Sequence, residues 1–171
     1  VFIIAMVTYG LTIEPTASFW DCPEFISTAA KLEVGHPPGA PFFMLTGKFV
    51  SLFASDPTQI AYCINMLSAF FSALTILFLY WTITHLARRI LQQDGKEMSA
   101  WQLIVCLGSG LIGALAYTFS DTFWFSAVEG EVYAMSSLFT ALVSKYNFVR
   151  AISSLQSFCS SHSAKVIINQ Q

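Results

Sequence analysis

The stretch IAYCINMLSAFFSALTILFLYWTITHLA, residues 60–87, decides the fold class of this protein. It belongs to a longer run, residues 57–87, that contains no Asp, Glu, Lys or Arg. A transmembrane helix needs about 20 apolar residues, so the run is long enough to cross a bilayer with some tilt. Arg88 and Arg89 end it abruptly. We therefore predict a membrane-spanning helix over residues 58–87.

The overall composition agrees with a membrane protein. Of the 171 residues 55% are hydrophobic and 11% are charged, whereas soluble domains carry about 25% charged residues. This excludes a disordered chain, a basic nucleic-acid-binding domain and an ordinary cytosolic enzyme. The net charge of −2 implies no global electrostatic partner. A second uncharged stretch, residues 98–120, predicts a span over 99–120, and we expect an all-α, multispanning transmembrane helical bundle.

The second span contains two pairs of small residues at helical spacing. They are Ser109 with Gly113, and Gly110 with Ala114. Such pairs suit the close packing of helices in lipid. A helix that simply contains glycine is the alternative, and the sequence leaves both open.

Two shorter apolar segments are harder to assign. Residues 1–13 are too short to span alone, and they lack the basic region of a signal peptide. They are either the cut end of a first transmembrane helix, which we expect, or a short buried helix. Residues 40–54 either cross the membrane or lie in its interface.

The distribution of charge favours the interfacial position. The loop RRILQQDGKE, residues 88–97, is assigned to the cytoplasm by the positive-inside rule. If residues 40–54 do not cross, Asp21 and the acidic residues between 121 and 131 face outward together. We therefore predict an external loop with juxtamembrane helices over 14–54.

The chain is expected to have two parts. Residues 1–143 form the transmembrane part, whose last helix begins within 131–143. Residues 144–171 are rich in serine and hold no stretch long enough to span. This tail is interpreted as a frame-shifted or disordered end, or as an amphipathic interfacial segment. The cysteines show no metal-ligand spacing and no metal site stands out.

The external loop holds the richest chemistry. Ionisable residues next to a membrane are functional candidates, and here they include Glu14, Asp21, Glu24, Lys31 and His36. Asp21 has a structural alternative, because an aspartate followed by a proline in the first helical turn and a glutamate three residues on is typical of a helix N-cap. The two roles are compatible, since a capping carboxylate is held rigidly.

Two further features have paired interpretations. His36 opens HPPGAP, a stiff extended segment, which either holds the imidazole in place or simply separates two helices. Asp121, Glu129, Glu131 and Tyr133 follow the second span. They are either solvated groups in an aromatic interfacial belt or a second wall of a sugar-binding site.

Four segments together resemble a known family. They are SFWDCPEF (18–25), VGHPPGAPFF (34–43), the run 65–89 and the run 114–142. Over about residues 1–143 the chain resembles the amino-terminal part of the DUF2723 family of multispanning proteins, whose eukaryotic relative is a protein O-mannosyltransferase. That family is in turn similar to the GT-C superfamily of membrane glycosyltransferases, so the resemblance implies a partial GT-C-like module.

The resemblance extends to motifs. Asp21 matches the acidic position that opens the first juxtamembrane helix in GT-C enzymes. His36-Pro37-Pro38 matches a Lys-Pro-Pro-like element before the second. Two positions depart from that pattern, since Cys22 replaces a Glu and His36 replaces the Lys.

The function implied is transfer of a sugar, mannose being one candidate, from a polyprenyl-phosphate donor to a protein Ser/Thr or other hydroxyl acceptor on the extracytoplasmic side. Asp21 is the expected base of this inverting reaction. Donor-phosphate or substrate contacts are assigned to His36, Lys31, Glu24 and Glu14. No cofactor beyond the lipid-linked sugar as co-substrate, and no nucleic acid, is implied.

The location implied is a bacterial inner membrane, or the endoplasmic reticulum in a eukaryote, with membrane lipid as a partner. The fragment alone is expected to be inactive. Two other classes of protein remain open at this stage. They are a non-catalytic membrane anchor or assembly subunit, and a component of a transporter.

Overall fold

The computed structural model describes residues 1–37, 39–92 and 97–168, with side chains as far as residue 151 and at Ser154. These residues form an all-α structure, which confirms the predicted class. Its elements are α1 (Phe2–Leu11), α2 (Cys22–Lys31), α3 (Pro41–Ser51), a short 3-10 helix η1 (Pro57–Gln59), α4 (Ile60–Leu91), α5 (Ala100–Thr118), α6 (Asp121–Val128) and α7 (Val132–Ile168).

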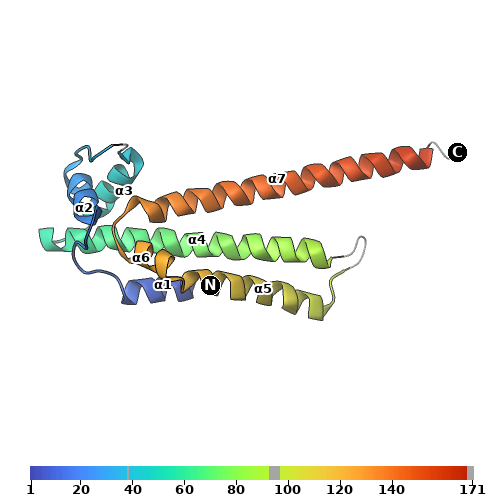
Figure 1. Ribbon diagram of the computed structural model, residues 1–171, viewed down its shortest axis with the longest axis horizontal. Coiled ribbons are helices and arrows are strands. Elements are labelled where there is room, and N and C mark those ends of the chain that lie inside the picture. The colour runs from blue at the N-terminus through green and yellow to red at the C-terminus, as the bar shows by residue number, and fades with distance from the viewer. Residues whose placement is uncertain (38, 93–96, 169–171) are drawn as a thin grey trace.

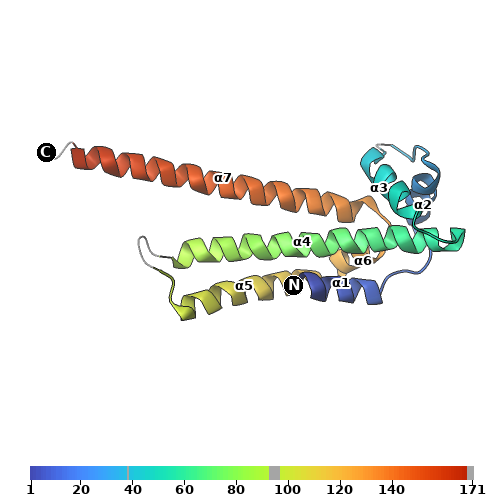
Figure 2. The same cartoon turned by 180° about the vertical axis from the view of Figure 1, so that it is seen from behind.

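Helix α4 is the centre of the structure. Helices α1 and α5 pack along one side of it and α7 along the other (Figures 1 and 2). Small side chains on α4 are buried at these contacts, among them Ser68, Ala69, Ser72 and Ala73. Small residues let helix backbones approach closely, so they explain why one helix can hold three neighbours.

Helix α5 approaches α4 through a stripe of small residues. Cys106, Gly110, Ala114 and Thr118 recur every four residues and are buried. A Cβ atom added to Gly110 would lie 2.4 Å from Cγ2 of Thr84 on α4. Gly110 and Ala114 therefore serve close packing rather than being incidental.

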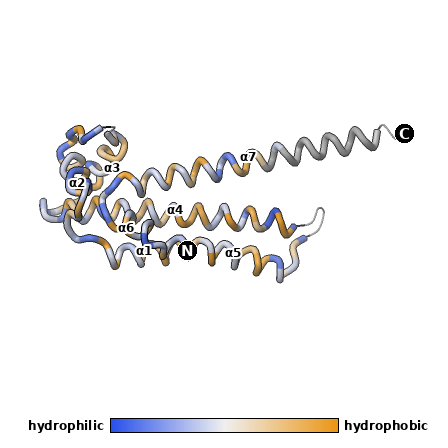
Figure 3. The backbone as a smooth tube through the Cα atoms, in the orientation of Figure 1, coloured by the Kyte–Doolittle hydropathy of each residue, from blue (hydrophilic) through white to orange (hydrophobic). Residues whose placement is uncertain are grey.

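Two of the described helices, over Pro57–Leu91 and Ala100–Thr118, are long and apolar enough to cross a membrane by length and composition (Figure 3). They match the two spans expected from the sequence. The face of α5 turned away from α4 exposes Trp101, Ile104 and Ile112, each by more than 60%. So large an apolar face suits contact with lipid or with another protein.

Two helices differ from the sequence-based expectation. Helix α7 continues through residue 143 to Ile168, because residues 132–168 contain neither Gly nor Pro and serine alone does not end a helix. Residues 121–128, for which the sequence predicted no helix, form the short helix α6. This helix is too short to show a clear hydrophobic periodicity, so the sequence did not predict it.

Helices α2 and α3 form a pair at one end of α4 (Figure 1). Phe25 and Phe43 meet edge to face with centroids 5.9 Å apart. Gly47 lies so close to α2 that an added Cβ would be 2.9 Å from Cβ of Ala29. Eleven residues of α3 extend about 16 Å, roughly half of a bilayer core, so α3 is too short to span one.

Candidate functional site

The loop between α1 and α2, residues 12–21, is tied across the end of the bundle. Asn65, buried on α4, donates from Nδ2 to the carbonyl oxygens of Glu14 and Thr16, at 2.7 and 2.9 Å. The backbone N–H of Glu14 donates to the carbonyl of Val128 at 3.2 Å. These bonds hold the loop against both α4 and the end of α6.

Two acids follow α6 and are buried beneath this loop. Ser18 donates from Oγ to Oε1 of Glu129 at 2.5 Å, and Glu129 is only 4% exposed. Its Oε2 has no hydrogen-bond partner among the described residues. Burial raises the pKa of Glu131, and the negative charges of Glu129 and Asp21 raise it further. The three carboxylates therefore form one electrostatic cluster.

Asp21 is the exposed member of that cluster. It occupies the N-cap position of α2, yet its side chain makes no hydrogen bond to the helix. Its φ of −83° and ψ of −11° are helical, whereas a capping residue usually has an extended backbone. The side chain therefore does not act as a cap, and it stays open to a ligand.

The residue before Asp21 has an unusual backbone. Trp20 has a φ of 62°, and its side chain is 84% exposed. A bulky residue in this region is strained by about 1–3 kcal/mol, and such strain is concentrated at functional sites. The turn at Trp20 leads directly into α2 and so sets the position of Asp21.

Glu24 fixes the segment that holds His36. Its Oε1 accepts from the backbone N–H of His36 at 2.7 Å, and its Oε2 lies 3.1 Å from Nδ1 of the imidazole. The backbone N–H, and then the imidazole, lower the pKa of Glu24. The His36 ring also packs on Phe25, with centroids 5.8 Å apart. The glutamate expected to complete a capping box thus positions the histidine.

The two lysines of this region lie near the end of α2 that is opposite to Asp21. Lys31 is the last residue of α2, about 15 Å along the helix from Asp21. Lys48 donates from Nζ to the carbonyl of Ala30 at 2.6 Å. It therefore joins α3 to the last turn of α2.

Two other residues of the expected second wall also lie outside the cluster. Asp121 is the exposed first residue of α6, about 12 Å of helix away from Glu129. Tyr133 is 57% exposed at the start of α7. The structure thus brings together Asp21, Glu129 and Glu131, and separately Glu24 with His36.

Three contributors to the site were not among the predicted site residues. They are Ser18, Asn65 and Cys22. Cys22 is fully buried, and burial, with the charges of the two acids, raises the pKa of its thiol. Asn65 carried a signal, because a strongly polar side chain within a span is a functional candidate. Ser18 carried none.

Comparison with known proteins identifies the family to which this chain belongs. The profile of the protein O-mannosyl-transferase TMEM260 N-terminal domain matches residues 21–167. The chain belongs to this family. The match begins at Asp21, includes both buried acids, and continues along α7 almost to its end. The relationship to an O-mannosyltransferase that the sequence implied is confirmed at the level of the family.

Two curated relatives carry that name. The protein O-mannosyl-transferase tmem260 of Dictyostelium discoideum is 28% identical over 143 residues, covering 83% of this chain and 15% of the relative. The protein O-mannosyl-transferase TMEM260 of Mus musculus is 27% identical over 144 residues, covering 84% of this chain and 18% of the relative. The chain spans less than a fifth of either. No solved structure matches significantly.

Proposed function

We propose that this protein takes part in transferring a sugar from a polyprenyl-phosphate donor to a hydroxyl acceptor outside the cytoplasm. The family match that begins at Asp21 carries the proposal. It is supported by the exposed carboxylate of Asp21 beside two buried acids. A Ser or Thr hydroxyl is the acceptor, because the relatives are named protein O-mannosyl-transferases.

The reaction is a single displacement. The acceptor oxygen attacks the anomeric carbon of the sugar, and a new C–O bond forms as the bond from that carbon to the phosphate oxygen breaks. The hydroxyl proton passes to Asp21, and polyprenyl phosphate departs with the bonding electrons. Attack from the face opposite the phosphate inverts the anomeric configuration.

Asp21 has the properties that a general base needs. Such a group must reach the acceptor hydroxyl and must be held in place. The carboxylate of Asp21 is exposed and makes no hydrogen bond to α2. The next residue, Cys22, is fully buried and anchors the start of the helix. Glu129 holds the preceding loop through Ser18. In this proposal Glu129 and Glu131 position the base rather than accept the proton.

His36 is the proposed contact for the departing phosphate. A donor or cation there stabilises the charge that develops on the leaving group. The contact with Glu24 uses Nδ1, so a ligand would meet Nε2. Lys31 supplies a further exposed cation at the far end of α2. Apolar side chains of α3 and α4 would receive the polyprenyl chain.

The experiment that tests this proposal compares donor classes. The complete reading frame is expressed in membranes and supplied with a Ser/Thr-rich peptide and labelled mannose, carried either by polyprenyl phosphate or by a nucleotide. We expect labelled peptide from the lipid-linked donor alone. Folded protein that transfers from no polyprenyl-phosphate sugar, or that uses the nucleotide sugar directly, would contradict the proposal.

A further inference from the structure

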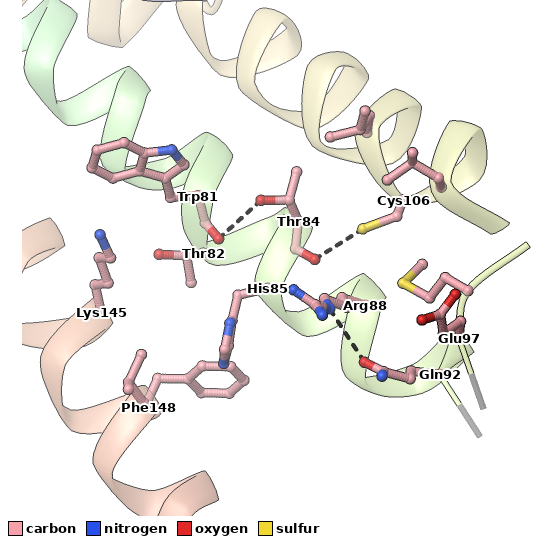
Figure 4. A pocket seen from close by; sticks show the side chains of 14 residues that line it. Trp81, Thr82, Thr84, His85, Arg88, Gln92, Glu97, Cys106, Lys145 and Phe148 are labelled. Atoms are coloured by element: carbon pink, nitrogen blue, oxygen red, sulfur yellow. Dashed lines mark hydrogen bonds between the residues drawn. The ribbon is translucent and has the colours of Figure 1, made fainter. Parts of the chain in front are cut away.

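A cavity lies at the opposite end of the bundle from the carboxylates. It has a volume of about 890 Å³ and is formed by α4, α5 and α7 together with residues that follow α4 (Figure 4). The proposed sugar transfer uses none of its residues. Its lining combines basic side chains from α4 and α7 with an apolar wall from α5.

The basic side chains are ordered by aromatic and polar contacts. Lys145 on α7 places Nζ 3.9 Å from the ring centroid of Trp81. Arg88 donates from Nε to Oε1 of Gln92 at 3.2 Å (Figure 4). Because the planar guanidinium has five N–H donors, this single bond leaves others for a ligand. The two cations thus approach the cavity from different helices.

His85 lies in the cavity wall between these cations (Figure 4). Its ring meets Phe148 edge to face, with centroids 6.2 Å apart. The Nε2 atom is buried and has no hydrogen-bond partner among the described residues. The imidazole therefore packs into the wall of the cavity, with Nε2 covered by protein.

Contacts of α5 indicate the depth of the cavity relative to the membrane. Cys106 donates from Sγ to the carbonyl of Thr84 at 3.1 Å, which places Thr84 about 9 Å from the start of α5. Trp81 and Trp101 are exposed near this end, by 44% and 71%. Exposed tryptophans beside terminal arginines mark the interface between lipid tails and water. The cavity therefore lies at the depth of lipid headgroups.

We infer that this cavity binds the phosphate headgroup of an anionic phospholipid. Arg88 and Lys145 supply the positive charge. Among the described lining residues Glu97 is the one acid, and the two cations outweigh it. The apolar wall includes Leu103 and Leu107 and continues into the exposed face of α5. That continuity favours a lipid, whose tails would cover this face, over a soluble phosphate.

The test measures lipid binding by the purified full chain in detergent. Native mass spectrometry follows titration with phosphatidylglycerol or with phosphatidylcholine of the same chain length. We expect one phosphatidylglycerol to bind in preference to phosphatidylcholine. Arg88→Gln and Lys145→Gln should each weaken that binding about fivefold, since a basic residue near anionic lipid contributes about 1 kcal/mol. Arg89→Gln is the matched control, because Arg89 is adjacent but does not line the cavity.

Three results would overturn the inference. Equal binding of the two lipids by the wild-type protein would do so without any variant. If Arg89→Gln weakened phosphatidylglycerol binding as much as Arg88→Gln, the lipid would be responding only to the positive charge at the end of α4 and not to the cavity. Displacement of the lipid by soluble glycerol phosphate would show a site for free phosphate. Circular dichroism of each variant establishes that its helices remain.

Discussion

The side chains of Asp21 and Ser99 occupy the same position at the start of two helices and behave differently. Ser99 accepts from the backbone N–H of Gln102 and forms a full capping box, whereas Asp21 makes no such bond. The sequence alone suggested a cap at Asp21, because it shows residue types but not the direction of a side chain. At this residue the carboxylate is available for chemistry.

Replacing these two residues by alanine should therefore have different effects on the free energy of unfolding. Ser99→Ala is expected to lower the free energy of unfolding by about 0.5–2 kcal/mol. Asp21→Ala should change it by less than about 0.5 kcal/mol, as for a surface position without such contacts. Unfolding of the purified chain by denaturant in mixed micelles measures both. A loss at Asp21 equal to that at Ser99 would restore the capping role.

The buried acid Glu131 should make stability depend on pH. Its pKa is raised in the folded state, so the folded protein binds more protons than the unfolded chain between about pH 4.5 and the raised value. Stability must then fall as the pH rises through that window. Glu131→Gln removes the titrating group, and it should be more stable than wild type at neutral pH, with the difference vanishing in acid. Thermal unfolding between pH 4 and 8 checks this, with Glu33→Gln as the exposed control. If the unfolding temperatures of wild type and Glu131→Gln changed in parallel with pH, the predicted role of Glu131 would be contradicted.

At the scale of elements, the long helices follow from hydropathy and length, and their contacts follow from small residues. The spans of α4 and α5 could be predicted because each is a long uncharged stretch. The short helix α6 could not, and neither could the contact of Ser18 with Glu129, which joins residues 111 positions apart. Asp21 and Glu24 could be placed at one helix start from their spacing, but the sequence did not show that their side chains belong to different groups.

The packing of α5 on α4 predicts contrasting effects at two glycines. Gly110 faces Thr84, whereas a Cβ atom at Gly108 would meet no other atom within 4 Å. Gly110→Ala should therefore destabilise the chain by about 1–3 kcal/mol through overpacking. Gly108→Ala should be neutral or stabilising, because alanine favours a helix. The same unfolding assay measures both, and equal effects at the two positions would show that this interface is not closely packed.

At the scale of the whole molecule, the carboxylates and the basic cavity lie at opposite ends of α4. Figure 2 shows α2 and α3 at one end, and the end of α4 with the start of α5 at the other. If α4 crosses the bilayer, these ends face different compartments. The sequence indicated this through its charge distribution, although it could not show that the segments after α1 and α6 meet.

Labelling of single introduced cysteines tests that topology. Trp20→Cys and Arg89→Cys place thiols at exposed positions near the two ends, and the unaltered chain gives the background from its own cysteines. A membrane-impermeant maleimide applied to sealed membrane vesicles of known orientation should label position 20 and position 89 from opposite sides. Labelling of both positions from one side would show that α4 does not cross the membrane between them.

The most direct test of the proposed mechanism is the transfer activity of Asp21→Asn. Asparagine keeps the size of aspartate and caps helices equally well, but it cannot accept the proton. At matched expression of the complete reading frame, we expect Asp21→Asn to lose at least about 100-fold of the mannose transfer from polyprenyl phosphate to a Ser/Thr-rich peptide, while Glu33→Gln retains it. Transfer by Asp21→Asn at the wild-type rate would contradict the role of Asp21 as the base.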